Sequence, residues 1–82
     1  MIELFVAILN RSAKDLDSDS ADLRAQSLDY FLLDNEAFIK SCKDFAIDSD
    51  FIMEQVKKVA KEKGFRRKKL VENLIIKIRE YL

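Results

Sequence analysis

The stretch RRKKLVENLIIKIREYL, residues 66–82, predicts the fold of this chain most clearly. Its apolar residues follow the i, i+3, i+4, i+7, i+11 spacing of one helix face, at Val71, Leu74, Ile75, Ile78 and Leu82. Charged residues fill most of the other positions. The pattern therefore predicts an amphipathic helix from about Arg66 to Tyr81 that turns one face toward a core.

The rest of the chain also carries helical patterns. The same periodicity and the capping residues predict four more helices, over about residues 2–14, 21–33, 35–45 and 49–63. The expected caps are Ser20, then Asp34 or Asn35, then Asp48 or Ser49, with Gly64 as the left-handed stop of the fourth helix. One Gly and no Pro leave few residues suited to β turns. The sequence predicts one all-α domain over residues 1–82, a compact bundle of about five helices.

Apolar faces on these helices predict both a core and a dimer interface. Ile2, Phe5, Val6 and Leu9 share one face of the first helix, but Leu4 and Ile8 lie off it, so this helix is apolar nearly all round. It is expected either at the centre of the core or against a second copy. Together with the stripe 71–82 it offers more apolar surface than a small core readily hides, which predicts a homodimer through these faces. The expected stripe of the second helix is Ala21, Ala25, Leu28 and Leu32.

The side chains that catalysis and metal binding use most often are scarce. There is no histidine, and Cys42 is the single cysteine. Without a histidine to activate it, Cys42 on an apolar helix face is expected to be a buried structural residue and not a nucleophile. The sequence also has no Gly-rich phosphate loop and no metal-ligand cluster. We therefore expect neither an enzyme nor a cofactor.

An acidic segment between the first two helices raises the question of calcium. Asp15, Asp17 and Asp19 occupy positions 1, 3 and 5 of an EF-hand-like loop. Ser20 stands where the loop needs Gly, and Gln26 stands where it needs a bidentate Glu. A capped loop is the favoured interpretation, and a further alternative is that these acids bind a basic partner or mimic DNA phosphates.

The zero net charge hides a strong asymmetry. Residues 1–50 carry 11 acidic and 5 basic residues, whereas residues 51–82 carry 4 acidic and 10 basic ones. Between positions 57 and 69 there are eight bases and one acid, Glu62. Clustered Lys and Arg are typical of contacts to a phosphate backbone. The predicted nucleic-acid-binding residues are therefore Lys57, Lys58, Lys61, Lys63, Arg66, Arg67, Lys68 and Lys69. The alternatives are a solvated surface, or a docking face for acidic residues of this chain or of another protein.

Residues 38–56 have the pattern of helix, tight turn, helix. Cys42 fills the small position of the first helix, Ala46 stands in the turn, and Ile52 and Val56 anchor the second helix. In a DNA-binding unit the helix 49–63 would be the recognition helix, with its lysines facing phosphates. The alternative is an ordinary hairpin with a solvated lysine face.

The first turn of that helix is acidic, with Asp48, Asp50 and Glu54. In such units the first turn usually meets base edges, and carboxylates there repel the DNA backbone. Phosphate contact from the later bases is therefore expected to dominate over base reading.

Three segments carry a family resemblance: residues 13–16 (AKDL), 27–34 (SLDYFLLD) and 38–52 (FIKSCKDFAIDSDFI). They are similar to the motifs A-x-x-D-L, A-x-x-W-x-x-S-D and F-x-x-I-C-x-x-L-G-x-D-P-x-x-V-R of small uncharacterised proteins encoded by phages and prophages. The most specific matches are Phe38, Cys42, Ile47 and Asp48. The resemblance covers about two thirds of the chain. It implies a mobile-element origin and a helix-turn-helix-like core, but it supplies no activity.

Several residues depart from those motifs. Tyr30 stands in place of Trp, Ala46 in place of Gly, Ser49 in place of Pro, and Met53 and Glu54 in place of the arginines. Loss of the arginines weakens any transfer of a DNA contact from the family to this chain.

The expected location is the cytoplasm, of a bacterium or of the host cell of a mobile element. The opening run Met1–Leu9 is apolar except for Glu3, but it has no basic segment before it and is shorter than the ~20 residues of a membrane span. A single cysteine cannot form an intrachain disulfide and fits a reducing compartment. No contact with a membrane is expected.

Taken together, the sequence predicts a small phage-type helix-turn-helix-like protein that binds nucleic acid mainly through phosphate contacts, with a regulatory role. The alternative is a module that binds or inhibits a host protein through its acidic and basic faces.

Overall fold

The computed structural model describes all 82 residues and contains only helices and connecting turns. The helices are α1 (Ile2–Asp15), α2 (Ala21–Leu28), the π-helical turn η1 (Asp29–Leu33), α3 (Glu36–Asp44), α4 (Ser49–Ala60) and α5 (Gly64–Arg79). The predicted all-α bundle of about five helices is confirmed. None of these helices combines the length and the apolar character needed to cross a membrane.

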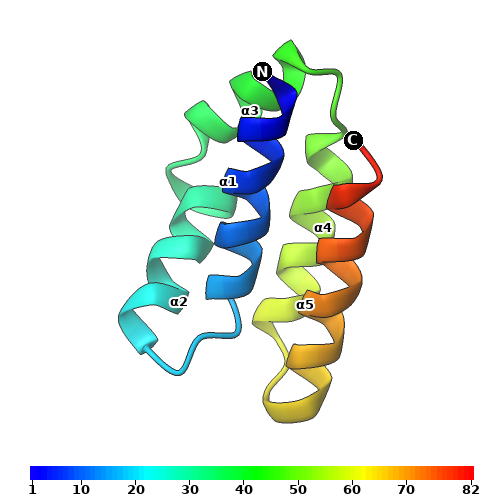
Figure 1. Cartoon of the computed structure of the whole chain (residues 1–82). Coiled ribbons are helices and arrows are strands. Elements are labelled where there is room, and N and C mark those ends of the chain that lie inside the picture. The colour runs from blue at the N-terminus through cyan, green and yellow to red at the C-terminus, as the bar shows by residue number, and fades with distance from the viewer.

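Four helices run up and down, and the short α3 lies at the end where both termini are found (Figure 1). α1 packs most extensively against α5, and α4 runs beside α5 in the opposite direction. The loop between α1 and α2 and the turn between α4 and α5 therefore share the other end of the bundle. This end is the one on which the charged segments of the sequence meet.

The core is a single cluster of apolar side chains contributed by every α-helix except α2, together with the η1 turn. Phe31 and Phe38 are its largest buried residues and meet edge to face, with ring centroids 5.2 Å apart. Burial of a side chain of this size stabilises the fold by ~2–3 kcal/mol, and the aromatic pair adds ~1 kcal/mol. The predicted buried positions are confirmed for most of three helices, at Phe5, Val6 and Leu9, at Ile52, Val56 and Val59, and at Val71, Leu74 and Ile78.

The stripe predicted for the second helix is only half correct: Leu28 and Leu32 are partly buried and pack against the core, but its two alanines do not. Ala21 and Ala25 are exposed, and the fully covered residues of this segment are Ser27 and Phe31. Ser27 and Phe31 share a helix face with the half-buried Arg24 and Leu28, at i, i+3, i+4 and i+7. Two of these four residues are polar, so a search for apolar periodicity does not find the face.

The turn between α3 and α4 has the geometry of a Schellman motif. Ala46 adopts a left-handed φ of 57°, the N–H of Ile47 donates to the carbonyl of Cys42 at 2.8 Å, and the N–H of Ala46 donates to the carbonyl of Lys43 at 3.3 Å. Asp48 then caps α4, because its side chain accepts from the N–H of Phe51 at 3.0 Å. The predicted hairpin and its turn at Ala46 are confirmed.

The turn between α4 and α5 begins earlier than predicted. α4 ends at Ala60 and not near Lys63, and α5 begins at Gly64 and not at Arg66. Gly64 does take the left-handed conformation expected of it, with φ 59°, but it follows the extended Lys63 and opens α5. A short connection of three residues reverses the chain, and this reversal requires the helix to stop sooner.

Two further end effects differ from the predictions. Neither Asp34 nor Asn35 caps α3 with its side chain; Asn35 is at the N-cap, but its amide donates to the carbonyl of Phe31 at 3.0 Å. That carbonyl belongs to the π-helical turn, so Asn35 closes the preceding helix. α5 ends at Arg79, which leaves Leu82 exposed and outside the stripe predicted for it.

Candidate nucleic-acid interface

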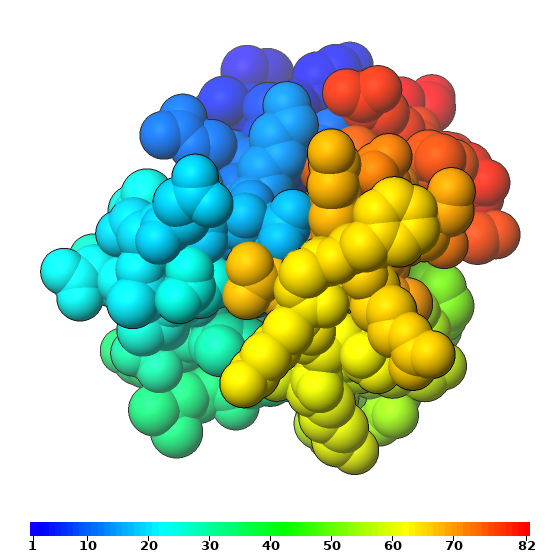
Figure 2. Space-filling view, turned by 90° about the horizontal axis from the view of Figure 1, so that it is seen from below, coloured from blue at the N-terminus to red at the C-terminus, as the bar shows by residue number.

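The basic residues gather at one end of the bundle. Residues 57–69, called the basic tip below, comprise the last turn of α4, the connection and the first turns of α5. They carry eight positive charges against one negative, a net charge of +7. Figure 2 views the molecule from this end, where the segment around residues 60–70 stands forward of its neighbours. The antiparallel pairing of α4 and α5 creates this concentration of charge.

The lysines of α4 point away from the core. Lys57, Lys58 and Lys61 are all exposed, on the side of the helix opposite the buried stripe of α4. Lys57 lies 3.6 Å from the carboxylate of Glu54, and both side chains are more than half exposed. A pair of this kind contributes less than ~1 kcal/mol, so it does not hold Lys57 away from other anions.

Most of the remaining bases are also free. Lys63, Arg66, Lys68 and Lys69 are exposed. Excluding Lys57 and Arg67, six of the eight predicted residues have no carboxylate within ion-pair distance. The basic tip therefore presents unneutralised charge to solvent.

Arg67 is the exception among the eight. Its side chain is only 21% exposed, and its Nε donates to Oδ1 of Asp17, itself 23% exposed, at 2.7 Å. Arg67 precedes Val71, Leu74 and Ile78 at the i, i+4, i+7, i+11 spacing, so it begins the buried face of α5. Arg67 therefore links the basic tip to the loop between α1 and α2, and unlike its neighbours it already has a carboxylate partner.

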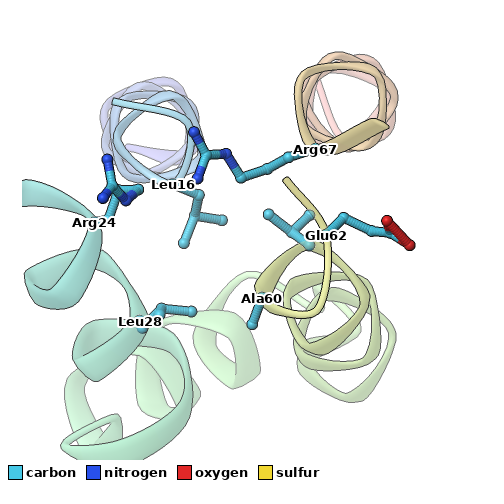
Figure 3. Close-up of a pocket in the computed structure, with 7 residues that line it drawn as sticks. Leu16, Arg24, Leu28, Ala60, Glu62 and Arg67 are labelled. Carbon is cyan, nitrogen blue, oxygen red and sulfur yellow. The ribbon is translucent and has the colours of Figure 1, made fainter. Parts of the chain in front are cut away.

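A small pocket is lined in part by Arg67 (Figure 3). It has a volume of about 90 Å³, and its walls come from the α1–α2 loop, α2, the end of α4 and α5: Leu16, Arg24, Leu28, Val59, Ala60, Glu62 and Arg67. The guanidinium group of Arg67 extends from α5 over Leu16 toward the side where Arg24 lies, whereas the carboxylate of Glu62 points away. Arg24 donates to the carbonyl of Ser18, so both arginines bind the same loop. The sequence patterns did not single out Arg24.

Phe65 is the residue of the tip that the sequence interpretation missed. Its ring is 78% exposed, the most of any large apolar residue apart from Met1. It lines an open groove of about 280 Å³ with Glu62, Arg66, Lys69 and Leu70. A lone aromatic residue inside a run of bases is the signal that would have found it.

Two of the three acidic residues considered as calcium ligands are paired with arginines, and the third, Asp19, is exposed. Asp15 pairs with Arg11 at 3.7 Å and Asp17 pairs with Arg67. No group of three carboxylate or thiol side chains in the chain is placed to hold a metal ion. The loop therefore acts as a structural partner of α5.

The predicted burial of Cys42 is confirmed. Burial, reinforced by the nearby charge of Asp48, raises the pKa of the Cys42 thiol from 9.0 to about 11. The thiol therefore stays protonated at neutral pH, the opposite of what a nucleophilic cysteine requires.

The helix-turn-helix unit and the basic tip are not brought together. The acidic first turn of α4 lies at the α3 end of the bundle, about two helical turns (~10 Å) before the tip begins at Lys57. The unit forms as predicted, but the exposed bases stand at the other end of its second helix.

The fold and the surface define a small all-α protein of five helices with a basic tip at one end. No model of a known protein family, no curated protein and no solved structure matches the chain.

Proposed function

We propose that this protein binds nucleic acid through its basic tip, with contacts to phosphates and not to base edges supplying the affinity. The observation that carries the proposal is the set of six exposed bases without an ion-pair partner at one end of the bundle. Lys and Arg that neutralise phosphates release condensed counterions, which drives binding and makes it depend on salt.

The geometry favours end-on contact over insertion of a recognition helix. A recognition helix places its first turn against the bases, and in α4 that turn carries Asp48 and Asp50. The bases of the tip come from two helices and the turn between them, so they are not a row along one helix.

The resemblance to small phage proteins fits this proposal, and we propose the same origin and a regulatory role for this chain. Ala46 stands where the family motif has Gly, and it adopts the left-handed conformation that glycine favours. The left-handed Ala46 supports the idea that this chain and the phage proteins have the same turn. The proposal of shared ancestry rests on this turn and on the motif residues.

Salt dependence tests the proposal. Fluorescence anisotropy with labelled oligonucleotides at several salt concentrations yields the slope of log K against log salt, which is ~−0.7 per phosphate contact for single strands and ~−0.9 for duplexes. Engagement of most of the six free bases predicts a slope of about −3 to −5. Absence of any complex with single strands or duplexes at ~50 mM salt would contradict the proposal.

A matched pair of double variants locates the contact. Lys58→Ala/Lys61→Ala removes two exposed lysines, three residues apart, from the tip. Lys40→Ala/Lys43→Ala removes two exposed lysines with the same spacing from α3, at the other end of the bundle. The first variant should weaken binding and reduce the slope by about 1.5, and the second should leave the slope unchanged. Equal effects would exclude the tip as the site.

A second candidate function, binding of a host protein or of another copy, is favoured by one observation on α1. Leu4 and Ile8 are exposed one helical turn apart, with the exposed Ala7 between them. Of the α5 stripe expected in a dimer, Val71, Leu74 and Ile78 are instead buried inside the chain. We propose self-association through the outer face of α1, which analytical ultracentrifugation of wild type and Leu4→Lys/Ile8→Lys would detect. A wild-type monomer at high micromolar concentration would contradict it.

A further inference from the structure

Phe65 is exposed in a setting that offers both stacking and charge. Its side chain stands on the first turn of α5, 78% exposed, and shares a groove of about 280 Å³ with Glu62, Arg66, Lys69 and Leu70, so two cations there outnumber one carboxylate. The core of the protein is complete without this ring, since the buried face of α5 begins at Arg67. Phe65 differs from the other exposed apolar side chains because it is aromatic and shares its groove with two free cations, Arg66 and Lys69.

We propose that Phe65 is a stacking platform for an unpaired base, and that the basic tip consequently prefers single-stranded nucleic acid. The inference rests on the proposed function and names its substrate class. A base has an apolar face for the ring, and its two flanking phosphates are anions for Arg66 and Lys69 on the same groove. Sequence-tolerant binding of single strands is built from this combination of aromatic side chains and a positive surface.

Duplexes and acidic peptides fit the groove less well. In a duplex each base face is covered by its neighbours, so a ring on the surface meets only sugars and phosphates. An acidic peptide satisfies the bases but has no flat face for Phe65. Stacking therefore predicts a difference between ligands that charge alone does not produce.

The test uses the full chain with a labelled oligonucleotide of twelve thymidines, the matching duplex, and polyglutamate as an acidic polymer without bases. Phe65→Ala removes the ring and leaves every charge in place. It should weaken binding of the single strand about 5- to 100-fold, the range seen when one stacked aromatic is removed. Binding of the duplex should change less than twofold. Because the side chain is exposed, circular dichroism should show an unchanged fold.

Phe65→Trp supplies a direct reporter, because the chain contains no other tryptophan. Its affinity for the single strand should match the wild type, and its emission should be quenched at saturation by the single strand and not by polyglutamate. Wild-type affinity in Phe65→Ala together with unquenched emission in Phe65→Trp would overturn the inference and leave phosphate binding intact. Binding of polyglutamate as tightly as the single strand would replace it with an acidic protein partner. No nucleic-acid complex with the wild type would overturn the proposed function itself.

Discussion

Replacing Arg67 by Ala should destabilise the protein, whereas replacing its neighbour Arg66 should not. The Arg67–Asp17 pair has an N–O distance of 2.7 Å, and about four fifths of each side chain is covered. Exposed ion pairs contribute ~0.2–1 kcal/mol, and hydrogen bonds to charged groups contribute ~1.5–3 kcal/mol. The partial burial places this pair between the two, at ~1–2 kcal/mol. Loss of the arginine stem over the pocket adds to it, so Arg67→Ala should lower the free energy of unfolding by ~2 kcal/mol.

Urea denaturation and thermal unfolding, both followed by circular dichroism, measure this effect. A loss of ~2 kcal/mol lowers Tm by ~8–16 °C in a domain of this size, whereas Arg66→Ala should stay within ~0.5 kcal/mol of the wild type. A double-mutant cycle with Asp17→Ala isolates the pair and should give a coupling of ~1–2 kcal/mol. The exposed Lys57–Glu54 pair, with its longer 3.6 Å separation, is the control and should give less than ~0.5 kcal/mol. Equal coupling in the two cycles would refute the structural role of Arg67.

Two other features of the fold yield predictions. Ala46 and Gly64 both have φ near 58°, and a Cβ on Gly64 would meet nothing within 4 Å. Ala46→Gly should therefore stabilise the protein by ~1 kcal/mol and Gly64→Ala should destabilise it by ~1 kcal/mol in urea titrations, whereas changes of the same sign would contradict the backbone account. The raised pKa of Cys42 means that the unfolded chain loses this proton first, so stability present below pH 9 should fall as pH rises toward 11. Compared with Cys42→Ala at each pH, the wild type should show an additional loss of ~2 kcal/mol between pH 8 and pH 11, and parallel curves would show that the thiol does not contribute.

The helices could be predicted from the sequence because apolar residues repeat with the helical period and capping residues mark several starts. Ile52, Val56 and Val59 illustrate this, since they are buried as their spacing predicts. The buried face of the second helix could not be predicted from apolar periodicity because half of that face is polar. Arg24 and Ser27 lie on it together with Leu28 and Phe31. Hydropathy alone assigns such residues to the surface.

The sequence indicates which bases belong to the candidate site but not how they are arranged. Asp17 and Arg67 are 50 residues apart in the sequence. No local pattern shows that the loop between α1 and α2 meets the start of α5 at one end of the bundle. The inward position of Arg67 was visible as the i−4 neighbour of Val71, but a long basic side chain whose stem packs inward looks like any other surface base. Phe65 lay inside a run of charges, and only the structure shows that its ring is left outside the core.

The central claim is that nucleic acid contacts the basic tip and not the first turn of α4. Nuclear magnetic resonance of the labelled protein, titrated with a short single-stranded oligonucleotide, tests it most directly. The account predicts shifted amide signals across residues 57–69 and a shifted Nε–H signal for Arg66. The Nε–H signal of Arg67 should stay in place, because this group donates to Asp17. Shifts concentrated at residues 45–52, or no shifts at all, would contradict it.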